Sequence, residues 1–405
     1  MKSATVTWIT YNNYGTELQA FALQQFILSL GIENVIISDE LMLEKAKPQE
    51  SNSAVQQHVD NSALQERNFL STIKRILKKY LFNLKACVTL VKDLIVAYKL
   101  QFEQNKREKA RRAYFDSQEK FNAFKKDKLN ILYNVSGENV SSLNDEIDVF
   151  ICGSDQIWSP LDCNFNGYYY LDFVKKKKIS YASSLGTTDI SDEKKEIIKN
   201  WTKDYFKVSV RESQSANQLS ELLNRNVDWV LDPTLLFDKS FWDKQRNNYR
   251  TKKKYIVCYF LENKEWYLSY AKSLSRHLNM DFYIIPSSKV YSENNHSFKR
   301  GIGPQEFVDV IAKSSFVLTD SYHASIFSLI FEKNFLYLKR FKDDAPNCQN
   351  IRIDSLFGLL NITDLIVEEK QFSEQDIQKL DYSIINQILD KERTCSQNYL
   401  KGCLL

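Results

Sequence analysis

Apolar residues near the start of the chain recur with two different periods. Residues 5–10 are rich in β-branched and aromatic side chains and predict a strand, and residues 17–30 carry apolar side chains at helical spacing. Thr16 is predicted to cap this helix, and residues 35–37 start a second strand. The order strand, loop, helix, strand is typical of a βαβ unit and predicts a parallel sheet.

The same alternation continues in two series along the chain. The first series has further predicted strands at 149–152, 179–182, 207–210 and 227–231. The charged and aromatic residues 238–254 lack a clear strand and form a predicted hinge. The second series has predicted strands at 255–261, 281–285, 316–318 and 335–338, and predicted helices at 266–278, 305–313 and 321–331.

Two such series predict an α/β fold with two Rossmann-like domains that face each other across a cleft. We expect an N-terminal domain at residues 1–238 and a C-terminal domain at residues 239–372. Residues 373–405 are predicted to form helices that pack back toward the first domain. Ligands of such sheets bind at the carboxyl ends of the strands.

Residues 61–130 interrupt the first series with a long basic segment of helical composition. Its Lys and Arg residues outnumber its Asp and Glu residues by about ten, and an apolar stripe runs from Ile76 to Val91. We expect a helical insertion in the first domain, formed by a hairpin or a pair of helices. Two interpretations remain open, a solvated amphipathic hairpin and a surface that docks on an anionic membrane.

Composition limits the classes of protein to which the chain can belong. The chain has 405 residues, is 43% hydrophobic and carries a formal net charge of +4, which gives no reason to expect a nucleic-acid partner. Its seven cysteines include no C-x-x-C pair, so neither a zinc site nor a disulfide framework is expected. No apolar run approaches the roughly 20 residues that span a bilayer. We therefore expect a cytoplasmic protein, with peripheral contact at the inner face of the membrane as the alternative.

Four loops at predicted strand ends carry candidate substrate-binding residues. Small polar side chains and glycines at such positions can hold an anion or a sugar hydroxyl, although each loop could equally be an ordinary turn or helix cap. The candidates are Asn13, Gly15, Thr16, Gly153, Ser154, Asp155, Gln156, Ser183, Ser184, Ser321 and Ser325.

Two residues are candidates for the chemistry itself. His323 stands at a predicted strand-to-helix turn, where an imidazole can act as general acid or base near neutral pH. Arg211 follows a predicted strand, where a guanidinium can bind a carboxylate or a phosphate. The alternatives are a structural histidine and a salt bridge between Arg211 and Glu212 or another acid. The segment from Asp232 to Thr234 is expected to be a turn.

Together these segments resemble the polysaccharide pyruvyl transferase family. The matching stretches, in the family's order, are residues 14–23, 153–160, 170–173, 179–186, 209–212, 231–234 and 319–323. The resemblance implies a GT-B-like fold, phosphoenolpyruvate as donor and a hydroxylated glycan as acceptor. This glycan would be a cell-surface polysaccharide or its lipid-linked precursor. It also implies that Arg211 binds the donor and that His323 lies near it. The family usually has glycine after this histidine, whereas Ala324 stands here.

The implied reaction forms a pyruvate ketal on the sugar and needs no metal and no cofactor beyond the donor. Two other functions remain open at this point. One is a glycosyltransferase that uses a nucleotide sugar, because the same architecture serves that class. The other is a non-catalytic binding protein in polysaccharide assembly.

Overall fold

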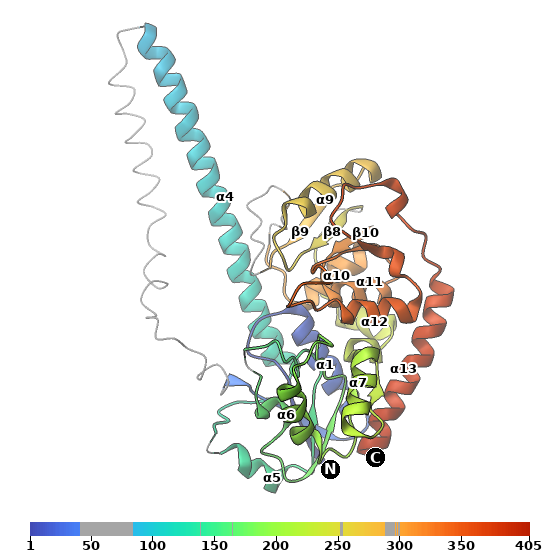
Figure 1. The fold of residues 1–405 in the computed structure, drawn as a ribbon. Helices are drawn as coiled ribbons and strands as arrows, with labels where there is room; N and C mark the ends of the chain where they lie inside the picture. The colour runs from blue at the N-terminus through green and yellow to red at the C-terminus, as the bar shows by residue number, and fades with distance from the viewer. Residues whose placement is uncertain are drawn as a thin grey trace.

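Two parallel five-stranded sheets form the framework of the molecule (Figure 1). The computed structural model describes residues 1–40, 84–137, 139–163, 165–251, 254–287, 296, 298 and 300–405. The first sheet has the order β3-β2-β1-β4-β5, and the second has the order β12-β11-β10-β8-β9. Both sheets contain only parallel pairs, which confirms the prediction of an α/β fold with two Rossmann-like domains.

The strands of both sheets are short and mostly buried. Those of the first sheet are β1 (Lys2–Val6), β2 (Glu33–Ile37), β3 (Ile131–Leu132), β4 (Val149–Cys152) and β5 (Lys177–Ser180). Those of the second are β8 (Ile256–Tyr259), β9 (Phe282–Ile285), β10 (Phe316–Thr319), β11 (Asn334–Leu338) and β12 (Ile366–Val367). A small third sheet pairs β6 (Ser209–Val210) with β7 (Asp228–Trp229), and isolated bridges join it to the chain that follows β5.

Helices cover these sheets and connect their strands. The α-helices are α1 (Tyr14–Ser29), α4 (Leu84–Lys128), α5 (Leu143–Glu146), α6 (Asp192–Thr202), α7 (Ser213–Leu223), α8 (Lys239–Gln245), α9 (Glu265–Leu278), α10 (Pro304–Lys313), α11 (Tyr322–Ile330), α12 (Ile351–Leu360) and α13 (Tyr382–Leu404). Short 3-10 helices are η1 (Val140–Ser142), η2 (Gly167–Tyr170), η3 (Pro233–Leu236), η4 (Thr363–Leu365) and η5 (Glu374–Asp376).

Several local predictions need correction. The first strand ends at Val6, and the first helix begins at Tyr14 because Asn13, rather than Thr16, caps it through bonds from the N–H groups of residues 15 and 16. The expected turn after Asp232 is the helix η3. The expected hinge begins with α8, whose Trp242 is fully buried and bonds the Thr234 carbonyl, so this part is packed core.

Other elements had no counterpart among the predictions. Strands β3 and β12 and helix α12 were not expected, and β6 and β7 are each shorter than predicted. Of the expected helical insertion, residues 61–83 lie outside the described residues. The remainder forms one continuous helix, α4, of 45 residues. The predicted domain limits stay a prediction.

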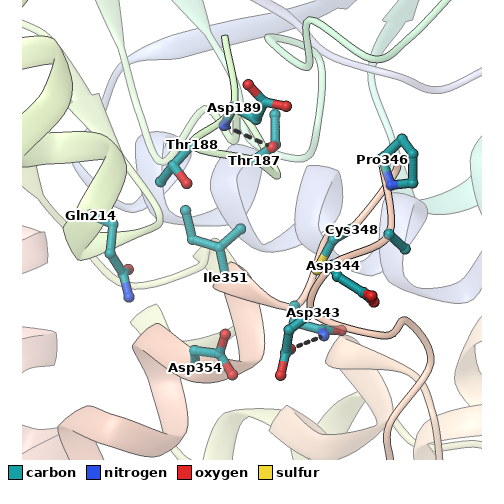
Figure 2. Close-up of a pocket in the computed structure, with 12 residues that line it drawn as sticks. Thr187, Thr188, Asp189, Gln214, Asp343, Asp344, Pro346, Cys348, Ile351 and Asp354 are labelled. Atoms are coloured by element: carbon teal, nitrogen blue, oxygen red, sulfur yellow. Dashed lines mark hydrogen bonds between the residues drawn. The ribbon is translucent and has the colours of Figure 1, made fainter.

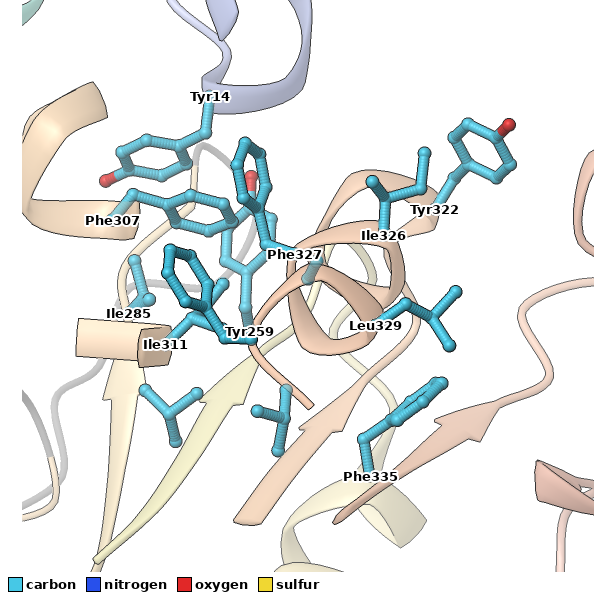
Figure 3. Packing of buried hydrophobic residues seen from close by; sticks show 14 of the residues in the cluster. Tyr14, Tyr259, Ile285, Phe307, Ile311, Tyr322, Ile326, Phe327, Leu329 and Phe335 are labelled. Carbon is cyan, nitrogen blue, oxygen red and sulfur yellow. The ribbon is translucent and has the colours of Figure 1, made fainter. Parts of the chain in front are cut away.

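Aromatic side chains bind the start of α1 to the C-terminal domain (Figure 3). The Tyr14 ring stacks on Phe307 of α10, with centroids 4.5 Å apart and an interplanar angle of 8°. Its hydroxyl donates to the Ile302 carbonyl at 2.9 Å, and further along α1 the Phe21 ring lies near Trp242. This contact between domains is closely packed, so it fixes the first turn of α1 against the second sheet.

The last helix returns to the first sheet. Helix α13 runs down one side of the molecule, and both termini lie at the same end (Figure 1). Leu400 and Cys403 belong to one apolar cluster with Ile151 of β4 and Ile179 of β5, and the Tyr399 hydroxyl donates to the Ser180 carbonyl at 2.9 Å. The chain therefore uses its C-terminus to cover a face of its N-terminal sheet.

Candidate active site

The candidate site lies where the carboxyl ends of strands from both sheets meet. Residues that follow β4, β6 and β7 contribute Asp155, Arg211 and Asp232, and the turn after β10 contributes His323. The first turn of α1 completes the group with Thr16. Strand-end positions are where α/β sheets place ligand-binding side chains, because parallel strands bring them to one edge.

Arg211 is the centre of a buried ion-pair cluster. Its Nη1 donates to Asp232 Oδ2 at 2.7 Å, and its Nη2 lies 3.4 Å from Asp155 Oδ1. Glu212 Oε1 lies 3.9 Å from Nε, which makes no hydrogen bond within the described residues. The alternative of a salt bridge with Glu212 or another acid is present through Asp232 and Asp155, and the contact with Glu212 is the longest of the three. Arg211 therefore holds several loops together and keeps Nε free of a close partner.

His323 bridges the two domains at this cluster. Its Nε2 lies 3.4 Å from Asp232 Oδ2 and makes no hydrogen bond in the part of the chain that the structure describes. The imidazole ring rests on Gly15, where any Cβ would overlap the ring. Glycine at position 15 is therefore required for this contact. The nitrogen that faces the cluster is thus buried beside a carboxylate, and its role in catalysis stays a prediction.

Two further arginines converge beside Arg211. The Arg340 and Arg352 side chains both donate to Gln349 Oε1, at 3.3 and 3.2 Å. The Tyr322 ring lies between Arg211, 4.7 Å from its centroid, and Arg352, 6.0 Å away. The Nε atoms of Arg340 and Arg352 are buried without a hydrogen-bond partner among the described residues. Arg211 is already paired with carboxylates, so the unbonded Nε–H groups of Arg340 and Arg352 are the part of this region that could bind an anion.

The charges and burial of this cluster shift the pKa values of its ionisable side chains. Burial alone would raise the pKa of Asp155, but Arg211 and His323 outweigh it and lower the value. For Asp232, burial is likewise outweighed by His323 and Arg211, and its pKa is lowered. Burial, then Arg340 and Arg211, lowers the pKa of Arg352 to about 10. Asp155 and Asp232 are thus held ionised, while Arg352 is a cation under repulsion from its neighbours.

Glu212 differs from the two aspartates. Burial raises its pKa, and Arg211 and the Ser184 hydroxyl offset only part of that rise. The Ser184 hydroxyl donates to Glu212 Oε1, which ties the loop after β5 to the start of α7. The other oxygen of Glu212 has no hydrogen-bond partner among the described residues.

Thr16 is the predicted residue with the most direct contact to the cluster. Its hydroxyl donates to Asp155 Oδ2 at 2.7 Å, and the Tyr11 hydroxyl lies 3.1 Å from the same Thr16 oxygen. Asn13 caps α1 and Gly15 supports His323, so each of the three predicted residues of this loop has a defined place.

Most of the predicted serines are bonded within the protein. Ser154 donates to the Ala182 carbonyl at 2.8 Å, and Ser183 donates to the Cys152 carbonyl at 3.0 Å. Gly153 has φ +123°, and a Cβ there would overlap the Tyr181 carbonyl. The hydroxyls of these loops therefore serve the packing of adjacent strand ends. Their roles as substrate contacts stay predictions.

The two predicted serines at the start of α11 are also bonded within the protein. Ser321 caps the helix by accepting from the Ala324 N–H at 3.4 Å, and Ser325 donates back to the Ser321 carbonyl. The first turn leaves the N–H groups of Tyr322 and His323 without partners inside the helix. Ala324 is fully buried and belongs to the large apolar cluster of the C-terminal domain.

A cavity of about 430 Å³ opens beside the cluster, between the two domains (Figure 2). Thr187, Thr188, Asp189 and Gln214 line it from the N-terminal domain, opposite Asp343, Asp344 and Asp354. Gln156, a predicted site residue, donates to Gln349 Oε1 at 3.0 Å and so connects the domains near this cavity. The lining is polar and carries four carboxyl groups.

Sequence reasoning missed several of these residues. Arg340 had a usable signal, because it closely follows the predicted strand at 335–338, whereas Arg352 follows no predicted strand. Tyr322 adjoins His323 and could have been included with it. Asp232 had a usable signal, its place directly after a predicted strand.

The described residues contain neither a candidate metal site nor a candidate membrane span. No three His, Cys, Asp or Glu side chains there are grouped so that they could hold a metal ion. None of the helices there combines the length and apolar character that crossing a membrane requires.

A family model described as polysaccharide pyruvyl transferase matches residues 13–340 of the chain. No curated protein matches the chain significantly. Similar solved structures include a glycosyltransferase from Rickettsia africae, 12% identical over 98% of this chain and 93% of that chain, with a TM-score of 0.42. The MnaA structure with UDP from S. aureus is 12% identical over 98% of this chain and 90% of that chain, with a TM-score of 0.45.

Proposed function

Because the chain belongs to the polysaccharide pyruvyl transferase family, we propose that it transfers the pyruvyl group of phosphoenolpyruvate to a glycan. The product would be a pyruvate ketal on a cell-surface polysaccharide or on its lipid-linked precursor. The observation that carries the proposal is the position of Arg352 near both Arg211 and Arg340, with His323 beside the Asp232 carboxylate that pairs with Arg211. Phosphoenolpyruvate is a small molecule with a carboxylate and a phosphate, and such an anion suits three guanidinium groups.

The donor would bind between the domains. Arg211 contacts its carboxylate through Nε, while Arg352 and Arg340 exchange part of their bonding to Gln349 for the anion. The N–H groups at the first turn of α11 face the same cluster through His323 and support the phosphate. Asp155 and Asp232 keep Arg211 in place, because both are ionised and bonded to it.

His323 would supply the proton that starts the reaction. Protonation of the methylene carbon makes a methyl group and leaves positive charge on the adjacent carbon, where a sugar hydroxyl attacks. The bond from this carbon to the phosphate oxygen then breaks, and a second hydroxyl of the same sugar closes the ketal. The two hydroxyls lose two protons, of which one balances the new methyl hydrogen and the other leaves with phosphate. Asp232 stabilises the imidazolium before the transfer.

The cavity beside the cluster is the proposed acceptor site. Three chain segments each contribute to the arginine cluster and to the cavity. The loop with Ser184 continues to Thr187. Arg211 precedes α7 by two residues and Gln214 lies in its first turn, and Asn350 precedes Arg352 by two residues. Hydroxyl, amide and carboxyl groups are the partners that sugar hydroxyls prefer. The volume is within the usual range for small-molecule sites.

We also propose that the enzyme acts in the cytoplasm. Cys152, Cys258 and Cys403 are buried free thiols, and structural thiols of this kind fit a reducing compartment.

The test is donor-dependent turnover. The purified enzyme should release phosphate from phosphoenolpyruvate only when a suitable glycan is present, and mass spectrometry should find one pyruvyl group on the product. Thermal stabilisation by phosphoenolpyruvate should exceed that by any nucleotide sugar. Stabilisation by a nucleotide sugar alone would favour a glycosyltransferase, and no stabilisation by either donor would favour a binding protein.

A further inference from the structure

The outer part of α4 extends away from both domains (Figure 1). The helix has 45 residues, which corresponds to about 68 Å at 1.5 Å per residue. Only its C-terminal part is anchored, since Ala113, Ser117, Phe121 and Phe124 are buried. Between residues 91 and 112, every side chain that the structure describes is exposed or half-buried.

One face of this outer part is apolar. Val91, Ile95, Tyr98 and Phe102 follow one another at intervals of four, three and four residues, so they form a single stripe along the helix. Their exposed fractions are 54%, 48%, 68% and 49%. Four large neighbouring apolar side chains in contact with water mark a surface that binds something.

The same face becomes basic closer to the body of the protein. Continuing the helical spacing from Phe102 leads to Asn105, Lys109 and Arg112, all of which are exposed. The face therefore has an apolar outer segment followed by a cationic inner segment. This order complements the surface of an anionic bilayer, with acyl chains beneath the phosphate groups.

We propose that this face of α4 docks on the surface of an anionic membrane. The stripe from Val91 to Phe102 enters the interface, and Lys109 and Arg112 meet lipid phosphates. Parallel pairing with a second copy is less suited, because it would bring Lys109 and Arg112 beside the same cations of the other copy.

The foot of α4 connects this surface to the candidate site. Lys125 donates to Asn12 Oδ1 at 2.7 Å, and the Asn12 side-chain amide donates to Gln118 Oε1 at 2.5 Å. Asn12 directly precedes the Asn13 cap of α1, which begins the loop that supports His323. A docked α4 would thus hold the site at a fixed distance from lipid-borne molecules.

Vesicle flotation of the full-length protein tests the proposal. The probes are vesicles of phosphatidylcholine with phosphatidylglycerol and vesicles of phosphatidylcholine alone. We expect binding only to the anionic vesicles, with loss at high salt. The double variant Ile95→Ser with Tyr98→Ser should reduce binding by about tenfold or more. Lys109→Glu with Arg112→Glu should do the same.

The matched control removes two apolar side chains from the other side of the helix. Val96→Ser with Leu100→Ser should retain binding within about twofold, because these exposed residues lie opposite the stripe. Unchanged thermal melting would show that each variant is folded. The proposal fails if the unmodified protein does not float, or if the control loses as much binding as the stripe variant. It also fails if sedimentation shows that the stripe variant converts a dimer to a monomer.

Discussion

The arginine cluster and the acidic cavity are neighbours with opposite character. The cluster contains the buried Arg211 and the half-buried Arg352 at the Tyr322 ring, with Arg340 bonded to the same Gln349 as Arg352. The cavity, built from continuations of the same chain segments, displays Asp189, Asp343, Asp344 and Asp354 toward open space. Buried guanidinium N–H groups without a partner among the described residues attract an anion, whereas exposed carboxyl groups repel one.

We propose that this difference separates the two substrates within one cleft. Under this proposal, a small anion is drawn into the inner part, and a neutral polyhydroxyl molecule is tolerated in the outer part. Charge would thus orient donor and acceptor before any shape-specific contact forms. The predictions below test the inner region first and the outer region afterwards.

The largest effect should follow removal of the imidazole. His323→Ala should lower kcat for phosphate release by about 10²–10⁴-fold, because general acid catalysis contributes that much. Steady-state phosphate release measures it. His277→Ala is the control, since that histidine pairs with Glu374 on the surface of the C-terminal domain. Full activity of the His323 variant would remove this residue from the mechanism.

Loss of one guanidinium should weaken the inner region's hold on the donor. Arg352→Gln should raise KM for phosphoenolpyruvate by about 10–100-fold, the equivalent of a charged hydrogen bond of 1.5–3 kcal/mol. Arg276→Gln on α9, whose side chain is exposed, should leave KM unchanged. An unaltered KM in the Arg352 variant would place the donor elsewhere.

The pKa of Arg352 provides a second test of the same contact. Burial, together with Arg340 and Arg211, lowers it to about 10. The charged form binds the anion, so donor affinity should fall as pH rises through about 10. Calorimetric titration across this range should show the decline in the unmodified enzyme and a smaller one in Arg352→Gln. Identical pH profiles would contradict the assignment.

Neutralising one wall of the cavity should change acceptor choice modestly. Asp354→Asn should raise kcat/KM for an acidic sugar relative to a neutral one by about 3–10-fold at low salt, since like-charge repulsion is reduced. KM for phosphoenolpyruvate should stay constant. Asp364→Asn, outside the cavity lining, is the control. An equal change in both variants would show a long-range charge effect only.

The last prediction concerns stability rather than activity, and a carboxyl group without a guanidinium partner. Glu17 is fully buried in α1, with Lys125 Nζ 3.3 Å away. Burial, only partly offset by Lys125, raises the pKa of Glu17 to about 8. In the unfolded chain the group releases its proton near 4.5, so folded-state stability declines as pH rises from 4.5 to 8.

Glu17→Gln should remove this decline. The variant should match the unmodified protein near pH 5 and gain about 1–2 kcal/mol at pH 8, the coupling to Lys125 reducing the full linkage value. Denaturant unfolding at both pH values measures the gain. A constant difference between the proteins across this range would refute the buried, protonated state.

Much of the framework could be predicted from local pattern. Alternating helical and strand periods predicted the parallel sheets, because each period depends on which side of one element is buried. The strand-end rule brought Asp155, Arg211 and His323 onto one candidate list, and the structure places them around Asp232. Element limits were less accurate: Asn13 competes with Thr16 as the cap, and only backbone geometry separates them.

The sequence by itself therefore determined the α/β class, the family resemblance and the core of the site, since these depend on neighbours along the chain. Only the tertiary structure decided which charges meet. Arg352 comes close to Arg211 through packing between domains, and the serines of the strand-end loops find their partners on other strands. Contacts between residues so distant along the chain leave no periodic signal, because they depend on how whole elements dock.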